Sequence, residues 1–453
     1  MSGKQDLLEA LDAASDTHVR FLQVLVQAPS PNPPGDTRAA AAVVTSFLSG
    51  HGIPYEIVSP DRGGDGSNDA VLYPNVVSEF AGGAGPGPRL VLNGHLDVFP
   101  VDPATLPQWT HAPWSGHIDE DGSRIHGRGV VDMKLGTAAL AVAYAFLYAR
   151  RHRLRGSVLF CAVSDEETGG RWGTSYLVKT NPGRFGGDVM LGAEPAGVGS
   201  VRFSEKGTLR MWCTVTTAGA HGAYSNLSVG AIRTAAAYVG DATRAVEGIK
   251  VELSHDIREQ LKQPQVRQRI DDIMGPGTAD VIARPTVNVG IIEGGDGSLN
   301  MIPASCRFSL DIRLPIGLTR EHVIPLLKDL TKQYPHAGFE FAVVEAASNP
   351  ASISPLGHPL LGLLIDNAAA LADDNGDDDD GRPLAIPSMG ATDCKHYRYA
   401  GIPAYVYGGS PRTMAQVNES ASLKEYLHIL KVHAAAAWDY LQEGGALDEA
   451  GRT

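Results

Sequence analysis

The chain has 453 residues, of which 43% are hydrophobic and 20% are charged, and its net charge is −13. This length predicts two to three domains, and the composition is typical of a globular protein. The negative charge argues against nucleic acid or an anionic membrane as a partner. We expect no membrane span and no secretory signal in the polar N-terminal stretch.

Four cysteines are widely separated and form no C-x-x-C pair: Cys161, Cys213, Cys306 and Cys394. Each of them lies in or beside an apolar run of the sequence. Scattered cysteines of this kind predict reduced thiols in an intracellular, cytoplasmic protein.

The first two hundred residues alternate predicted helices with short apolar strands. Helical patterns cover residues 5–27, 36–53 and 132–151. The strands PRLVLNGHLDV, GSVLFCAVSDEE and GDVMLGAE are continuous apolar runs that end in polar residues. Such runs are typical of strands buried on both faces, as in a parallel sheet covered by helices. Because ligands gather at the carboxyl ends of these strands, we expect the polar ends to share one edge.

The pattern changes near residue 200, where RFSEKGTLRMWCTVTTAG alternates apolar and polar residues as one amphipathic strand would. Two further strands and two helices follow before residue 350, and a helix–strand–helix pattern then returns. We therefore predict an α/β fold. Its catalytic domain, residues 1–199 and 348–453, has a mixed, mostly parallel sheet flanked by helices, and residues 200–347 form an inserted α+β lid and dimerisation domain.

Four short motifs carry side chains that bind metals or transfer protons. GHLDV places His95 two residues before Asp97, which suits a metal ligand with an orienting carboxylate. GRGVVDMK places Asp132 before a long helix, where a helix cap is the ordinary explanation. SDEETGG contributes Glu166 and Glu167, which alone indicate a solvated turn.

The fourth motif, LGAEPAG, places Glu194 after an apolar strand. A buried carboxylate is rare unless it is paired or binds a metal. Each of the four motifs has an ordinary structural explanation when it is considered alone.

Together and in this order, the motifs make the chain resemble the zinc aminoacylase, acetylornithine deacetylase and succinyl-diaminopimelate desuccinylase family, which includes carboxypeptidase G-type metallopeptidases. The resemblance extends from about residue 15 to residue 442. It rests on GHLDVFP, GRGVVDMKLG, SDEETGG, GAEP, AGAHGAYSNLSVGAI, NMIPASCRFSLDIR and GATDCKHYRYAGIPAYVYG.

The resemblance implies a role for each residue of these motifs. His95 and Glu194 would bind a first metal, Glu167 a second metal, and Asp132 both metals, with Asp97 behind His95 and Glu166 as the general base for a metal-bound water. The metals would be one or two Zn²⁺ ions, with Co²⁺ or Mn²⁺ as alternatives.

The resemblance also implies roles for the inserted domain. His221 would reach the active site of a neighbouring subunit and stabilise the oxyanion. Asn300 and Arg313 would hold the substrate carboxylate or the oxyanion. The expected assembly is a homodimer through the inserted domain.

One expected ligand is missing near the C-terminal end. The family places a histidine three residues before an Asn–Glu pair, and here that position is Ala415, before Asn418 and Glu419. Gln416 and His396 are poor substitutes. The second metal site is therefore expected to be weak, empty or shifted towards Mn²⁺ or Mg²⁺.

Three interpretations of Ala415 stay open: a natural branch that works with one tight metal, an engineered substitution, or a descendant that no longer hydrolyses its substrate. The resemblance favours a metal-dependent hydrolase of an N-acyl amino acid or a small peptide-like amide with a free carboxylate. The alternative is an inactivated family member that binds or otherwise transforms a related small molecule.

Overall fold

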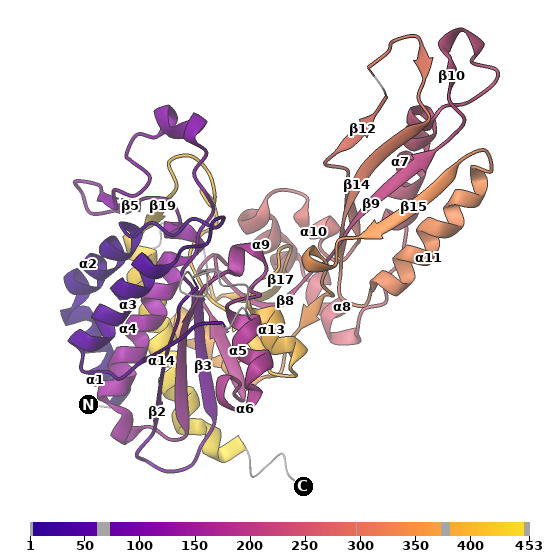
Figure 1. The fold of residues 1–453 in the computed structure, drawn as a ribbon. Helices are drawn as coiled ribbons and strands as arrows, with labels where there is room; N and C mark the ends of the chain where they lie inside the picture. The colour runs from indigo at the N-terminus through magenta and orange to yellow at the C-terminus, as the bar shows by residue number, and fades with distance from the viewer. Residues whose placement is uncertain (1–2, 61–72, 296, 373–380, 448–453) are drawn as a thin grey trace.

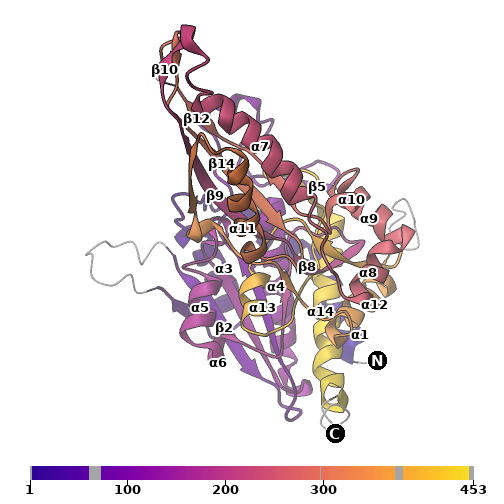
Figure 2. The same ribbon diagram turned by 90° about the vertical axis from the view of Figure 1, so that its right-hand side faces the viewer.

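A computed structural model describes residues 3–60, 73–295, 297–372 and 381–447 of the chain. The chain forms a large domain that contains both termini of the described part, and a smaller domain that projects from it (Figure 1). A quarter turn shows the same projection, with β10 (Ala220–His221) at its far tip (Figure 2).

The large domain is built on a nine-stranded sheet with the order β1-β2-β6-β3-β7-β18-β8-β16, in which β17 also pairs with β8. The strands are β1 (Glu56–Val58), β2 (Asn75–Ala81), β3 (Arg89–His95), β6 (Ser157–Val163), β7 (Val189–Gly192), β8 (Ser200–Glu205), β16 (Ser352–Ile353), β17 (Leu384–Ser388) and β18 (Ala404–Val406). The central pairs β6–β3, β3–β7 and β7–β18 are parallel, whereas the edge pairs β1–β2 and β16–β8 are antiparallel. The predicted mixed sheet with a parallel centre is confirmed.

Helices cover both faces of this sheet, as the unbroken apolar strands predicted. One face carries α1 (Gly3–Ala13), α2 (Ser15–Val26), α3 (Arg38–Gly50), α4 (Leu135–Ala149), α12 (Pro359–Ala370) and α14 (Leu423–Leu447). The other face carries α5 (Thr174–Thr180), α6 (Pro182–Phe185) and α13 (Cys394–Tyr399).

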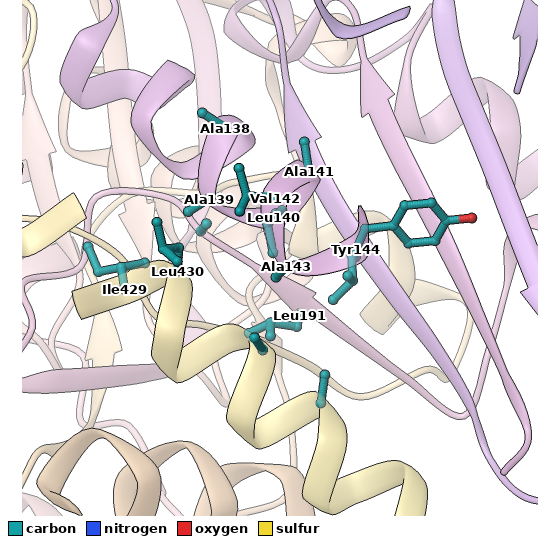
Figure 3. Close-up of a cluster of buried hydrophobic side chains, with 14 of the residues drawn as sticks. Ala138, Ala139, Leu140, Ala141, Val142, Ala143, Tyr144, Leu191, Ile429 and Leu430 are labelled. Atoms are coloured by element: carbon teal, nitrogen blue, oxygen red, sulfur yellow. The ribbon is translucent and has the colours of Figure 1, made fainter. Parts of the chain in front are cut away.

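Helix α4 is the centre of the larger core. Figure 3 shows its alanines and Leu140 beside Ile429 and Leu430 of α14, with Leu191 of β7 below them. All of these side chains are buried, and truncating one such leucine to alanine costs about 2–5 kcal/mol. The packing holds α4 firmly behind the strand ends.

The apolar character of α4 has a second consequence. In the part of the chain that the structure describes, Val130–Ala149 is long and apolar enough to cross a membrane by length and composition alone. No stretch of this length was predicted from the sequence. The fold buries 89% of its apolar window, so this hydrophobicity is satisfied by core packing.

The smaller domain, called the lid below, has a five-stranded sheet with the order β11-β14-β9-β15, and β12 also pairs with β14. Its elements are β9 (Gly207–Thr216), β11 (Thr286–Asn288), β12 (Ile292–Gly294), β14 (Ser305–Leu314), β15 (Gly338–Val343), α7 (Ala231–Glu247) and α11 (Arg320–Leu330). Alternate residues of β9 and β14 are buried against α7 and α11. This is the α+β arrangement that the alternating pattern predicted.

The expectation of one strand over residues 202–219 is wrong, because the chain passes there from one sheet to the other. β8 lies in the large sheet with all six of its residues buried, whereas β9 shows the half-buried pattern of the lid. Arg202 and Glu205 are polar residues of β8. The buried Arg202 guanidinium donates hydrogen bonds to the carbonyls of Ala196 and Pro387. The lid sheet therefore begins at Gly207 rather than at residue 200.

Part of the inserted segment also returns to the large domain. Helices α8 (His255–Lys262), α9 (Pro264–Met274) and α10 (Thr278–Val281) were not predicted from the sequence. Ile386 of β17 packs with Val266 and Ile270 of α9 and with Ile282. The four cysteines are all buried free thiols, as predicted.

Candidate active site

Three adjacent parallel strands end at one edge of the large sheet and carry the predicted site residues there. His95 is the last residue of β3, Glu166 and Glu167 follow β6, and Glu194 follows β7. Asp132 joins them from the turn before α4. The strand order β6-β3-β7 explains why residues a hundred positions apart become neighbours.

His95, Asp132 and Glu194 form a compact group whose ligand atoms all lie within 4.8 Å of one another. His95 Nε2 lies 3.1 Å from Asp132 Oδ1 and 3.7 Å from Glu194 Oε2. The three side chains are only 0%, 14% and 8% exposed, in that order. Burial alone would lower the pKa of His95, yet the charge of Glu194 and the hydrogen bond with Asp132 raise that pKa well above its usual value. This group of side chains thus favours a positive charge.

The backbone around Asp97 fixes the orientation of His95. His95 Nδ1 donates to the carbonyl oxygen of Asp97 at 2.8 Å, whereas the nearest Asp97 carboxylate oxygen is 3.6 Å away. Because a carbonyl can only accept, Nδ1 carries a proton, and Nε2 faces the acidic group. The main orienting group is therefore the carbonyl, and not the carboxylate that the motif suggested.

The buried Asp97 carboxylate instead holds the loop that carries the two glutamates. It accepts hydrogen bonds from the backbone N–H groups of Glu166 at 3.1 Å and Glu167 at 3.0 Å. Asn32 donates to it at 2.8 Å. Asn32 was missed by sequence reasoning, although its stretch SPNPPG is marked by its prolines.

Asp132 does not cap α4, which was the ordinary explanation of its position. Its backbone is non-helical, with φ −122° and ψ 100°, and the N-cap residue of the helix is Lys134. The preceding turn is held by Glu419, which accepts from the Val131 N–H at 2.9 Å and pairs with Arg128 at 2.6 Å. Buried and paired in this way, Glu419 positions the ligand from the far end of the sequence.

Close packing also fixes Glu194 against α4. A Cβ atom at Gly136 would lie 2.1 Å from the carbonyl oxygen of Ala193. Only glycine therefore allows the first turn of α4 to approach the residue before Glu194 so closely.

Glu166 has a buried lysine as its neighbour. Lys395 Nζ lies 3.5 Å from Glu166 Oε1, and the two side chains are 7% and 12% exposed. Burial raises the pKa of Glu166 to about 7, while the positive charge of Lys395 opposes this rise. A carboxyl group of this kind suits proton transfer near neutral pH. Lys395 was missed as a site residue, although GATDCKHYR was among the motifs of the resemblance.

Glu167 supplies a further test of whether a cation fits. Its Oε1 atom is buried and has no hydrogen-bond partner among the described residues. Burial, and then the charge of Asp132, raise the pKa of Glu167 to about 11. An unpartnered oxygen among crowded carboxylates costs free energy that a divalent cation would remove. The residues present therefore fit a metal ion.

Comparison with known proteins identifies the family to which the chain belongs. Residues 91–439 match the family described as Peptidase family M20/M25/M40, a span of more than half of the chain. The chain belongs to this peptidase family. The resemblance inferred from the motifs is thereby confirmed, and the chain is a metallohydrolase that acts on amides.

Individual relatives agree with this membership of the M20 family. The succinyl-diaminopimelate desuccinylase of Xanthobacter autotrophicus is 28% identical over 408 residues, covering 88% of this chain and 93% of the relative. An M20 family metallo-carboxypeptidase from Sulfolobus solfataricus has a TM-score of 0.72 at 19% identity, covering 94% of this chain and 99% of its own. The YXEP protein of Bacillus subtilis, described as a dinuclear metal binding peptidase from the M20 family, has a TM-score of 0.62 at 15% identity, covering 95% and 99%.

In this M20 chain, Ala415, where the resemblance predicts a histidine ligand, lies in an exposed turn. Ala415 is exposed and has φ 61°, in the left-handed region that alanine rarely adopts. The Gln416 amide donates to the Arg412 carbonyl at 3.1 Å. His396 Nε2 lies 3.2 Å from the Gly169 carbonyl oxygen and is occupied by the loop backbone. Each of these two side chains thus makes a local contact with the backbone.

The residues predicted on the lid fall in two places. His221 and Asn300 meet at the tip, where β10 pairs with β13 (Met301–Ile302), and their side-chain nitrogens are 3.4 Å apart. Both residues are exposed. Arg313 lies near the opposite end of β14, where its guanidinium contacts Asp311 at 3.1 Å. The structure brings the first two together and leaves Arg313 apart from them.

Proposed function

We propose that this chain hydrolyses the amide bond of an N-acyl amino acid or a small peptide-like substrate with a free carboxylate. The observation that carries the proposal is the buried group of His95, Asp132 and Glu194 with Glu166 on the neighbouring strand end. A cation ligand set beside a carboxyl group that can transfer a proton is the arrangement that amide hydrolysis needs.

His95, Asp132 and Glu194 would hold one Zn²⁺ ion, because one imidazole and two carboxylates supply the three protein ligands of a catalytic zinc site. A bound ion would supply Lewis-acid polarisation of the scissile carbonyl and a lower pKa for the attacking water. Co²⁺ or Mn²⁺ would serve the same ligands. Asp132 and Glu167 alone would hold a second ion weakly, since Ala415 contributes no donor atom.

The protein side chains perform the proton transfers. Glu166 would accept the proton of the attacking water and then deliver it to the leaving nitrogen. The Asp97 carboxylate keeps the backbone of Glu166 and Glu167 in place throughout. Lys395, which lies against Glu166, would restrain the orientation of that carboxyl group.

The lid of a second copy of the chain would complete the site. Large apolar side chains are exposed on it, including Tyr224 at 58%, Leu227 at 66%, Ile292 at 54% and Leu299 at 106%. An exposed apolar set of this kind favours an interface. His221 lies at the lid tip, far from the large domain of its own chain (Figure 1), so we propose a homodimer in which His221 serves the partner's site.

The substrate class follows from the family and from these side chains. The relatives named succinyl-diaminopimelate desuccinylase support an N-acyl amino acid. Asn300 and Arg313 are the proposed groups that hold a carboxylate or the oxyanion, the donor chemistry that such charges require.

Metal analysis and amine release together test the proposed hydrolysis. The full chain is loaded with Zn²⁺ and incubated with N-succinyl and N-acetyl amino acids, and with the matching carboxyl methyl esters as controls. We expect near-stoichiometric metal and amine release from the free acids, with much slower release from the esters. Fewer than about 0.2 ions per chain would contradict a three-ligand site. Bound metal without amine release from any substrate would favour the non-hydrolytic alternative.

Mixing two inactive variants tests the role of the partner. His221→Ala and Glu166→Gln chains are unfolded and refolded together, or co-expressed. If His221 acts across the interface, each heterodimer contains one intact site, and the mixture recovers about a quarter of the wild-type activity. Sedimentation of the wild-type chain as a monomer, or a mixture that stays inactive, would contradict the proposal.

A further inference from the structure

A second group of metal-binding side chains lies outside the site described above, on the short β-hairpin of the large domain. We propose that His111, His117 and Asp119 bind a divalent transition metal ion such as Zn²⁺, with His126 as the supporting residue. These residues belong to no motif of the family resemblance and take no part in the proposed hydrolysis.

The three residues already lie close enough to share an ion. One ligand atom from each of His111, His117 and Asp119 falls within 4.8 Å of the other two. His126 Nε2 lies 2.9 Å from Asp119 Oδ1. All four side chains are partly exposed, so that an ion has access to them from solvent.

The hairpin fixes three of these residues relative to one another. β4 (His117–Ile118) pairs antiparallel with β5 (Arg124–His126), and His117 lies directly opposite His126. The Asp119 N–H donates to the Arg124 carbonyl at 3.1 Å, which holds Asp119 at the end of β4. Cross-strand neighbours of this kind keep their Cβ atoms about 5 Å apart.

The loop that carries His111 is tied down on both sides. The Thr110 N–H donates to the Asn418 side chain at 2.7 Å, and the Pro113 carbonyl accepts from the Arg128 N–H at 2.8 Å. These contacts therefore hold the loop of His111 in place beside the hairpin. A site on rigid elements loses less conformational entropy on binding an ion.

The chemistry of the donor set selects the type of ion. Two imidazoles and one carboxylate suit Zn²⁺, Cu²⁺, Co²⁺ or Ni²⁺, whereas Ca²⁺ and Mg²⁺ prefer oxygen ligands alone. His126 would hold the Asp119 carboxylate in place, in the manner of a residue that orients a metal ligand.

Binding requires one local rearrangement. The rings of His111 and His117 are stacked, with their centroids 3.7 Å apart and their planes at 13°. An ion lies in the plane of each imidazole that binds it, so one of the two rings must rotate about its side-chain bonds. Both side chains are partly exposed and have room for this rotation.

Counting bound Zn²⁺ tests the proposal on the full chain. Equilibrium dialysis and elemental analysis are compared for the wild type and the His111→Asn/His117→Asn variant. The wild type is expected to bind one more ion per chain than the variant. His255→Asn is the matched control, because His255 is an exposed histidine beside an aspartate, Asp256, and belongs to neither of the metal-binding groups found among the described residues.

The same comparison in a His95→Ala background separates this site from the active site. The extra ion is expected to remain in that background and to disappear when His111 and His117 are also replaced, whether or not the proposed hydrolysis is correct. Equal Zn²⁺ stoichiometry in chains with and without the two histidines would overturn the proposal.

Chemical labelling of the wild type provides a measurement that depends on no variant. Diethyl pyrocarbonate modifies accessible imidazoles, and peptide mass spectrometry reports each histidine. Zn²⁺ is expected to slow labelling of His111 and His117 by about tenfold and to leave His255 unchanged. Equal labelling rates at His111 and His117 with and without Zn²⁺ would equally overturn the proposal.

Discussion

Two neighbouring groups of side chains at the strand edge differ in how they are built. His95 and Glu194 are buried and Asp132 is partly buried, and the group is supported by α4, by the Asp97 carbonyl and by Glu419. The second group consists of Asp132, Glu167 and the position of Ala415.

In the second group, Glu167 has an unpartnered oxygen, and Ala415 lies in an exposed turn with left-handed backbone. The surrounding frame is nonetheless kept, since Asn418 and Glu419 both make specific contacts with the large domain. The segment around Ala415 thus holds the turn before Asp132 through Glu419, although Ala415 itself offers no donor atom to a metal. Substitutions in the two groups and their supports, and a change of pH, test how far the groups depend on each other.

The largest effect is expected for Glu166→Gln. The amide cannot accept the proton of the attacking water, so kcat should fall by about 10²–10⁴-fold. Glutamine has nearly the same shape as glutamate and leaves His95, Asp132 and Glu194 unchanged, so elemental analysis should show the wild-type metal content. Unchanged turnover with bound metal would remove Glu166 from its proposed role.

Glu419→Gln should break the connection between the two groups. The substitution leaves the Arg128 guanidinium buried without its charged partner, which should reduce the free energy of unfolding by about 3–5 kcal/mol. Denaturant unfolding measures this loss, and Glu259→Gln, at the exposed pair with Lys262, is the matched control. If both variants unfold at the same denaturant concentration as the wild type, Glu419 does not support the turn before Asp132.

Acidification should weaken the contact between α14 and the segment that follows β18. His433 Nε2 donates to the Tyr407 carbonyl at 2.7 Å, and burial lowers the pKa of His433 to about 4. Because the unfolded state then binds more protons than the folded state, this contribution is complete above about pH 6.5 and is lost as the pH falls towards 4. Between pH 7 and pH 5 the loss is roughly 2 kcal/mol.

Thermal or denaturant unfolding as a function of pH checks this prediction, with His433→Gln as the comparison. Glutamine keeps an N–H donor for the Tyr407 carbonyl but does not titrate in this range, so the variant should lose less stability between pH 7 and pH 5. An identical pH dependence in both proteins would assign the acid sensitivity to other groups.

The smallest effect is expected for Ala415→His, which restores a donor to the second group. Histidine adopts left-handed backbone more readily than alanine, so the turn should accept it without loss of stability. Metal content should rise by about one ion per chain over the wild type, with a modest gain in kcat/KM. If neither metal content nor activity changes, the turn does not present position 415 to Glu167.

Much of the fold followed from the sequence, because apolar periodicity depends directly on burial. Unbroken apolar strands predicted a sheet covered on both faces, and alternation predicted a separate lid sheet with one exposed face. The same rule failed over residues 202–219. There Arg202 of β8 is buried because its guanidinium group donates to two backbone carbonyls. Residues 255–281 were missed because each of their helices buries only one or two residues, such as Ile257 of α8.

The motifs by themselves indicated the family, and they predicted the metal-binding side chains and a histidine expected at position 415, because metal chemistry restricts which side chains can serve. Only the tertiary structure decided how the residues act on one another. It assigned the orientation of His95 to a backbone carbonyl, the loop of Glu166 to the Asp97 carboxylate, and the turn before Asp132 to Glu419. It also placed Lys395 against Glu166. These contacts join residues far apart in the sequence, and a local pattern carries no information about such distances.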